Sequence, residues 1–217
     1  MNQTGKAVSW SVWIGVALTA ILLALAMFLL KVQRTGPPQI LHVIGSVPAF
    51  TLTNQLSQPV TRDDLKGRVW IADIIFTRCA GPCPVMTRQM RELQDALPAS
   101  SAARLVTLTT DADYDTPAVL AKEAARVGAK AERWNFLTGD KATIANLAID
   151  GLKLTAVATK PEERTNPADL FVHSTIFVVV DKQGQLRGTF QTQGEMVDWS
   201  QAKKQILAAV KQLESEP

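Results

Sequence analysis

The chain has 217 residues, of which 47% are hydrophobic and 20% charged, a composition that predicts a folded domain and excludes a disordered protein. Its 23 basic and 20 acidic residues give a net charge of +3, but residues 1–34 contain three of the basic residues and no acidic one. The rest of the chain is therefore neutral and offers no basic face to a phosphate backbone, so we expect no nucleic-acid partner.

The first predicted element is a membrane anchor. No charged residue occurs within residues 7–30, and about 20 apolar residues are enough for a helix to cross the hydrocarbon core. Trp10 and Trp13 lie at one end of this segment and Lys31 at the other, which is typical of bilayer interfaces. The apolar region of a cleaved signal is shorter, about 7–15 residues. We therefore predict an uncleaved anchor at residues 1–31 that contacts the lipid bilayer through residues 7–30.

Glycines and prolines gather in residues 32–47, which predicts a linker before a domain at residues 48–217. Basic residues flank the anchor on both sides, so charge alone does not decide its topology. No Arg-rich, Ser-rich transit peptide precedes the anchor, and this favours a bacterial envelope over an organelle.

Strand patterns alternate with helix patterns along the domain. The strongest strand runs from Val69 to Phe76, an apolar run broken only by Asp73, as expected for a strand covered on both faces. Further strands are expected at residues 50–53, 105–108, 134–137, 176–180 and 186–190, helices at residues 63–65, 84–97, 116–127, 140–149 and 199–213, and a polar loop at residues 158–169. This order predicts an α/β domain with one central sheet and helices on both faces.

Cys79 and Cys83 lie where the strongest strand passes into a helix. A helix start favours thiolate over thiol, because its first backbone N–H groups have no partner in the helix. Thiolates attack disulfides and bind soft metal ions, so this position supports either redox or metal chemistry. An inert disulfide is a third interpretation, but so short a loop would stabilise the fold by only about 2 kcal/mol. Met86 and Met90 follow at helical spacing and are expected in the core rather than at a metal.

Two more residues are candidates for the site. His173 lies just before the strand predicted at residues 176–180, and the loops at strand ends of an open sheet converge on sites. A lone histidine is nevertheless more often a surface residue. Asp73 lies inside the strand six residues before Cys79, where a carboxylate can accept the proton of a thiol. Its alternative role is that of a satisfied polar residue at a sheet position that is less buried.

Taken together, these stretches resemble the Sco/SenC family of membrane-anchored, thioredoxin-like copper proteins. The resemblance covers the anchor and nearly all of residues 48–194, and it rests on Phe50–Thr53, Leu65–Gly67, Phe76–Cys79, Cys83–Pro84, Asp115–Pro117, Leu137–Gly139, His173, and Asp181 with Gly184. It implies a thioredoxin-like fold in which Cys79, Cys83 and His173 bind a copper ion, Cu(I) or Cu(II). Their donor atoms agree with the softness of copper.

The resemblance also implies a function and a location. The protein would be a copper chaperone that delivers copper to the binuclear copper centre of cytochrome c oxidase, with the copper-receiving subunit of that enzyme, or another envelope cuproprotein, as its partner. It would be a single-pass protein of the bacterial inner membrane with its soluble domain in the periplasm. The segment at residues 110–117 departs from the family pattern, which leaves the role of Asp111 open.

The alternative is an enzyme, a thiol-disulfide oxidoreductase of the cell envelope. Cys79 would attack a target disulfide, Cys83 would resolve the mixed disulfide, and Asp73 would accept a proton. The C-x-x-x-C spacing departs from the C-x-x-C of dithiol reductases, and residues 173–175 contain no proline where those enzymes carry one before the facing strand. Three ligands are too few for a structural zinc site. We therefore expect a metallochaperone rather than an enzyme.

Overall fold

The structure, a computed structural model, describes residues 10–34, 41–158 and 171–217, and in them all side chains except those of residues 11, 28–34, 156–158 and 171–173. The chain divides into two compact units, Met1–Ile40 and Leu41–Pro217. Both hydrophobic cores lie entirely within the second unit, which therefore has the core that a domain needs to fold by itself.

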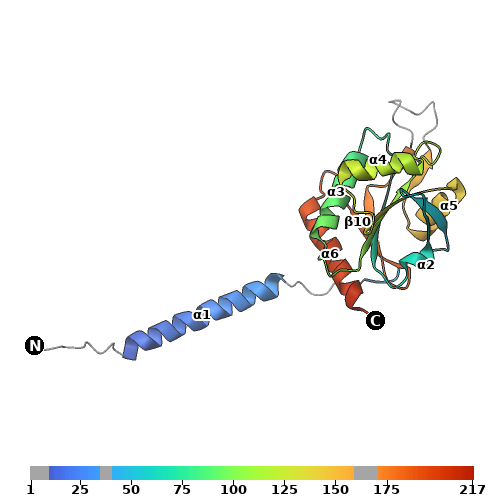
Figure 1. Ribbon diagram of the computed structural model, residues 1–217. Coiled ribbons are helices and arrows are strands. Elements are labelled where there is room, and N and C mark those ends of the chain that lie inside the picture. The colour runs from blue at the N-terminus through green and yellow to red at the C-terminus, as the bar shows by residue number, and fades with distance from the viewer. Residues whose placement is uncertain (1–9, 35–40, 159–170) are drawn as a thin grey trace, which may run out of the picture. The chain divides into compact units, whose positions relative to one another are not determined.

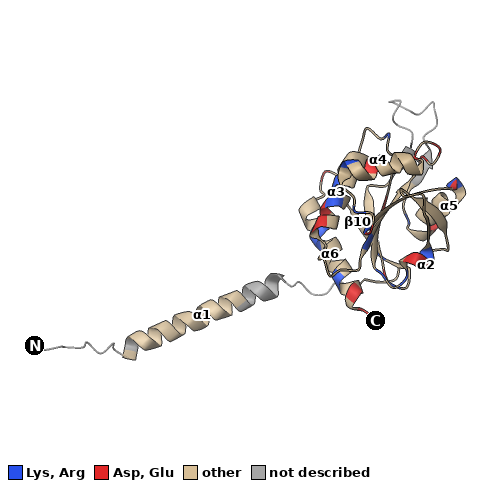
Figure 2. Ribbon diagram, in the orientation of Figure 1, with Lys and Arg blue, Asp and Glu red and all other residues tan. Residues whose placement is uncertain are grey.

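The first unit contains the helix α1 (Trp10–Arg34), whose coloured part in Figure 2 bears no charged residue. Its apolar side chains are exposed, for example Leu23 at 67%. Within the described residues, whose side chains in α1 end at Met27, no helix combines the length and the apolar character that crossing a membrane requires.

An eight-stranded mixed sheet forms the centre of the second unit (Figure 1). Its strands, in spatial order, are β1 (Gly45–Ser46), β10 (Gln185–Gln191), β9 (Ile176–Val180), β4 (Trp70–Ile75), β5 (Arg104–Thr109), β6 (Trp134–Thr138), β2 (Thr51–Asn54) and β3 (Pro59–Thr61). The central strands β4, β5 and β6 are parallel, so their carboxyl ends meet at one edge of the sheet. Loops that follow these strands are therefore brought together at that edge.

Helices cover both faces of the sheet. One core contains side chains of α3 (Cys83–Ala96), α4 (Pro117–Val127) and α6 (Trp199–Ser215), and the other contains side chains of α2 (Arg62–Leu65), α5 (Lys141–Ala145) and the π-helix η1 (Asn146–Gly151). Along β4, Ile71 and Ile75 pack into the first core, whereas Trp70 and Ile74 pack into the second, because successive side chains of a strand point to opposite faces. This arrangement confirms the predicted α/β architecture.

The structure differs from the sequence prediction at the start of the domain. Leu41 is buried in the first core and Ser46 of β1 pairs with Gln185, so residues 41–47, predicted as part of a linker, belong to the second unit. The two-residue strand β1 pairs with β10 and so satisfies backbone hydrogen-bonding groups at that edge of the sheet. A strand this short needs no periodic apolar pattern, so the sequence gives no sign of it.

Two further strands were not predicted from the sequence. β7 (Ala156–Ala158) pairs with β8 (Phe171–His173) in a separate two-stranded sheet. Apart from residue 158, the polar loop predicted between them at residues 158–169 lies outside the described residues. The helix predicted at residues 140–149 is α5 followed directly by η1.

Candidate functional site

The cysteine loop, residues 76–83, connects β4 to α3 at the carboxyl edge of the parallel strands. Pro82 is the N-cap of α3 and Pro84 lies in its first turn, where a missing N–H costs no hydrogen bond. The first turn has no acidic residue, and no side chain caps the helix. The dipole of α3 therefore favours a nearby anion, and a thiolate is the anion that this loop can supply.

The two thiols have different environments. Cys83 is buried, only 3% exposed, whereas Cys79 is half-buried. A hydrogen bond that the Cys83 thiol shares with the Cys79 side chain, followed by burial, raises the pKa of Cys83, and the charge of Asp73 acts in the same direction. A hydrogen bond with the backbone of Phe76 acts in the opposite direction.

Cys83 therefore keeps its proton at a pH where an ordinary cysteine has lost it. Because the pKa of this acid is higher in the folded state, its contribution to stability is present below the pKa of an unfolded thiol, about 8.5, and is lost as the pH rises above that value. Of the two sulfurs, that of Cys79 is accessible to solvent, whereas that of Cys83 is buried and stays protonated.

A hollow of about 20 Å³ adjoins both thiols. Its walls include Cys79, Cys83, Thr87 and the ion pair between Glu123 and Arg126. A space of this size holds roughly one water molecule or one metal ion and no organic substrate. The site is therefore suited to chemistry of the sulfurs themselves.

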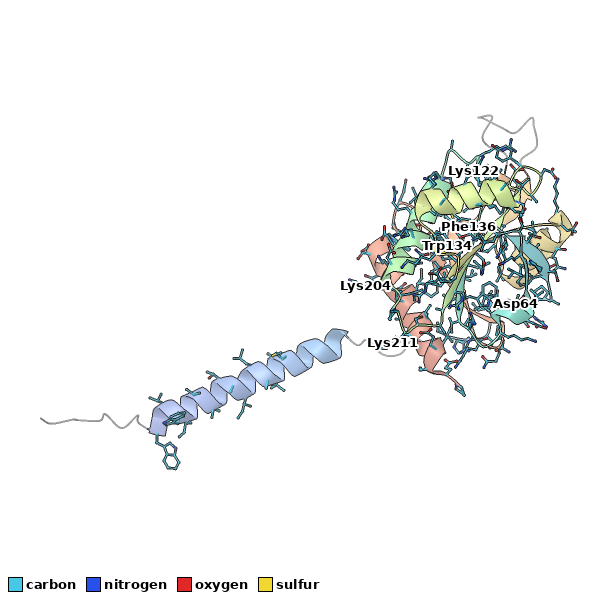
Figure 3. All side chains as sticks on the ribbon, viewed as in Figure 1. Asp64, Lys122, Trp134, Phe136, Lys204 and Lys211 are labelled. Atoms are coloured by element: carbon cyan, nitrogen blue, oxygen red, sulfur yellow. The ribbon has the colours of Figure 1, made fainter. Side chains whose placement is uncertain are left out.

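Asp73 lies in β4 on the face that α3 covers, and it is fully buried. Its Oδ1 accepts a hydrogen bond of 2.6 Å from Thr107 Oγ1, which in turn accepts one of 2.9 Å from the indole N–H of Trp134. The position of Trp134 on β6 is visible in Figure 3. These contacts hold the Asp73 carboxylate in place, and its negative charge helps to raise the pKa of Cys83. The predicted position of Asp73 inside this strand is confirmed, while its role in proton transfer stays a prediction.

The backbone of His173 is connected to the cysteine loop through two hydrogen-bonded steps. Thr192 donates from its N–H and its hydroxyl to the carbonyl of Thr175, at 2.9 and 2.8 Å, two residues beyond His173. Gln193 donates from its side-chain amide to the carbonyl of Pro82 at 3.1 Å. His173 is the last residue of β8, and the chain just beyond it, at Thr175, is thus linked through residues 192 and 193 to the loop that carries the cysteines, although the histidine side chain is outside the described part of the chain.

Among the described side chains, no group of three His, Cys, Asp or Glu residues is close enough together to hold a metal ion. The structure brings Cys79 and Cys83 together and adds the charge of Asp73. It does not test the third predicted ligand.

A second loop, residues 110–116, anchors the cysteine loop. Asp115 is fully buried and accepts hydrogen bonds from the Thr77 N–H at 3.0 Å, the Thr77 hydroxyl, and the Thr109 hydroxyl at 2.5 Å. Arg78 pairs with Asp111 at 2.5 Å and lies over the ring of Tyr114, 4.1 Å from its centroid. The hydrogen bond to Asp111 raises the pKa of Arg78.

Sequence reasoning missed the positioning role of Asp115, Arg78 and Gln193. The signal for Asp115 was available, because an acidic residue directly before the Thr116-Pro117 helix start cannot be the helix cap and needs another reason to be there. Gln193 offered no signal, since its partner is a backbone carbonyl 111 residues away.

A thioredoxin-like α/β domain with two interacting thiols at the start of a helix defines a thiol protein suited to disulfide exchange or soft-metal binding. The sequence profile of the SCO1/SenC family matches residues 44–210. The chain belongs to this family.

Individual relatives agree with this assignment. A SCO1 protein homolog of Bacillus subtilis is 36% identical over 142 residues, which cover 64% of this chain and 70% of the homolog. The solved structure of BsSco, described as a member of the Sco family of cytochrome c oxidase assembly proteins with a disulfide switch, is 31% identical, with a TM-score of 0.68 over 82% of this chain and 99% of that one. ScoI of Bradyrhizobium japonicum, solved with copper bound, shares the fold: TM-score 0.63, 20% identity, 77% of this chain and 99% of that one.

Proposed function

We propose that this protein is a membrane-tethered copper chaperone that binds copper as cargo through Cys79, Cys83 and His173. The observation that carries the proposal is the pair of interacting thiols at a helix start without a side-chain cap, beside a hollow large enough for a single ion. Thiolates select Cu(I), and an added imidazole serves Cu(II) as well. Copper bound to a family member of the same fold supports this choice of metal.

The proposed recipient is the binuclear copper centre of cytochrome c oxidase, or another envelope cuproprotein. The description of BsSco, at 31% identity, as a member of a family of oxidase assembly proteins supports this recipient. The proposed location is the bacterial inner membrane, with residues 7–30 in the bilayer and the domain in the periplasm. The uncharged run of residues 7–30 and the exposed apolar side chains of α1 support the tether.

Replacing His173 with alanine is expected to weaken Cu(II) binding by at least about 100-fold, because one of three donors is lost and loss of a group that merely orients a ligand already costs about 10- to 100-fold. The free energy of unfolding should change by less than about 1 kcal/mol. Competition titration with a Cu(II) chelator measures the affinity, and urea unfolding measures the stability. His42→Ala removes the other, exposed histidine and is the matched control. An unchanged Cu(II) affinity in His173→Ala would exclude this residue as a ligand.

A second candidate function is thiol-disulfide exchange, favoured by the asymmetry of the two cysteines. The Cys79 thiolate would attack one sulfur of a target disulfide, form a mixed disulfide and release one target thiolate. Cys83 would then lose its proton and attack the Cys79 sulfur, which closes the Cys79–Cys83 disulfide and releases the second target thiolate. Two electrons pass from the cysteine pair to the target.

This asymmetry makes a testable prediction. With a protein disulfide as target, Cys83→Ser should stop at a mixed disulfide on Cys79, whereas Cys79→Ser should react at least about tenfold more slowly, since only a buried thiol that holds its proton remains. Mass spectrometry of quenched samples identifies the adducts. If exchange is the main task, catalytic amounts of the reduced wild type should turn over the target disulfide in the presence of a thiol reductant. A silent assay would reject the second function.

A further inference from the structure

Three arginines meet at the edge of the sheet opposite the cysteines. Arg68 lies just before β4, Arg104 is the first residue of β5, and Arg133 lies just before β6. Backbone hydrogen bonds hold these positions side by side: the Arg104 N–H donates to the Val69 carbonyl at 2.9 Å, and the Leu105 N–H donates to the Arg133 carbonyl at 2.8 Å. Because the three strands are parallel, their amino ends form this edge, and the cysteine loop follows the other end of β4.

No carboxylate among the described residues forms an ion pair with any of these three guanidinium groups. Arg104 donates to the Ala102 carbonyl at 2.8 Å, and Arg133 donates to backbone carbonyls at the end of α3 and in the loop after it. Burial, followed by the charges of Arg68 and Arg133, lowers the pKa of Arg104, while Glu132 acts in the opposite direction. The cations thus repel one another, and an external anion would relieve that repulsion.

A hollow of about 370 Å³ opens beside Arg68. Lys182 and Ser100 also line it, as does Glu214. The Glu214 carboxylate is already engaged, because it accepts hydrogen bonds from the Ser101 hydroxyl at 2.7 Å and the Ala103 N–H at 3.1 Å. The hollow therefore brings to this edge one cation, Lys182, whose ammonium group donates to the carbonyls of Glu214 and Glu216, together with a hydroxyl group and the negative charge of Glu214. With Arg68, its lining carries one more positive charge than negative, which suits phosphate oxygens.

We propose that this arginine edge (Arg68, Arg104 and Arg133) binds the anionic headgroups of a phospholipid bilayer. Guanidinium groups pair with phosphate through two parallel hydrogen bonds, and each cation near an anionic surface strengthens binding about fivefold. A lipid surface is favoured over an acidic protein because the proposed tether holds the protein at a bilayer, so this inference rests on that part of the proposed function. With the arginine edge on the lipid, the cysteine loop at the opposite edge stays open to a copper-receiving partner.

The test uses residues 41–217, the unit that contains both cores, with vesicles of phosphatidylcholine alone or with about 30% phosphatidylglycerol. Sedimentation should show about 100-fold stronger binding to the anionic vesicles in low salt, as expected for three charges at about fivefold each, and the difference should disappear at about 0.5 M NaCl. Arg68→Gln/Arg104→Gln should weaken binding about 25-fold, as expected for two charges at fivefold each. Arg68→Glu changes only one exposed residue, so it leaves the fold intact, and it should weaken binding to the anionic vesicles by a similar factor.

Lys122→Gln/Lys204→Gln removes two exposed charges from α4 and α6 (Figure 3) and is the matched control, expected to change binding less than about twofold. Equal binding to both kinds of vesicle, or an equal loss in the control, would overturn the proposal. Displacement by millimolar inorganic phosphate at constant ionic strength would also overturn it in favour of a small-anion pocket. Membrane association of the full chain tests the tether on which this inference rests, and vesicle binding by residues 41–217, which lack the tether, tests the arginine edge, so the two failures are distinguishable.

Discussion

Replacing Cys79 or Cys83 with serine is expected to reduce Cu(I) affinity by well over 100-fold. Loss of a group that merely orients a ligand costs about 10- to 100-fold, and here a ligand itself is lost. A hydroxyl is a hard donor that Cu(I) does not select, and the remaining thiolate would hold the ion without its partner at the helix start. Anaerobic competition with a Cu(I) chelator measures the affinity.

The matched controls are Met86→Leu and Met90→Leu. Both methionines are fully buried in the first core, so the prediction that they are core residues is confirmed. Each replacement removes a soft thioether near Cys83 without removing a thiol, and should leave Cu(I) affinity within about threefold of the wild type. Because position 83 is buried, Cys83→Ser also buries a hydroxyl group, at a cost of about 1–3 kcal/mol in stability. Cys83→Ala removes the sulfur without adding a hydroxyl group, so it separates the two effects. Retention of Cu(I) by both serine variants would eliminate this site.

Replacing Asp115 with alanine is expected to destabilise the fold by about 2–4 kcal/mol, a loss of roughly 10 °C in Tm for a domain of this size. The reason is local: the side chain is fully buried and accepts from the N–H and hydroxyl of Thr77 and from the hydroxyl of Thr109. Without the carboxylate, the buried Thr109 hydroxyl is left unsatisfied, the half-buried Thr77 N–H and hydroxyl lose their acceptor, and the cysteine loop keeps only the Arg78–Asp111 pair as a side-chain connection to the loop at residues 110–116. Urea unfolding of the reduced protein measures the change.

Asp113→Ala provides the comparison for Asp115. Asp113 lies in the same loop, but its side chain is 77% exposed and its contact is a surface ion pair with Lys141, so its loss should cost at most about 1 kcal/mol. Equal destabilisation by the two substitutions would show that the buried hydrogen bonds of Asp115 do not hold the cysteine loop. A stable Asp115→Ala protein would show the same.

The strands of the central sheet were predictable because their apolar runs have a clear period. β4, β5, β6, β9 and β10 lie where the sequence placed them, within a few residues. The short strands β1, β3, β7 and β8 were not predictable, because two or three residues carry no period and form strands only when a neighbouring edge offers hydrogen bonds. Their positions depend on partners that are distant in the sequence.

The sequence alone determined the position of the thiols. Cys79 and Cys83 follow an apolar strand and precede a helix that two prolines help to start, and strand-to-helix order needs only local patterns to be recognised. It also placed Asp73 inside this strand, but it left the burial of that carboxylate open, and only the structure shows that Asp73 is fully buried.

The tertiary structure alone decided how the two thiols differ and what holds their loop in place. The pKa of Cys83 is raised by its hydrogen bond with Cys79, by burial and by the charge of Asp73, and the cysteine loop is held by Asp115, Asp111 and Gln193. The same holds for the arginine edge, whose members are 29 or more residues apart and meet only because three parallel strands begin at one edge. Local sequence patterns report periodicity along the chain, whereas burial, charge proximity and hydrogen-bond partners arise between segments and exist only in the folded state.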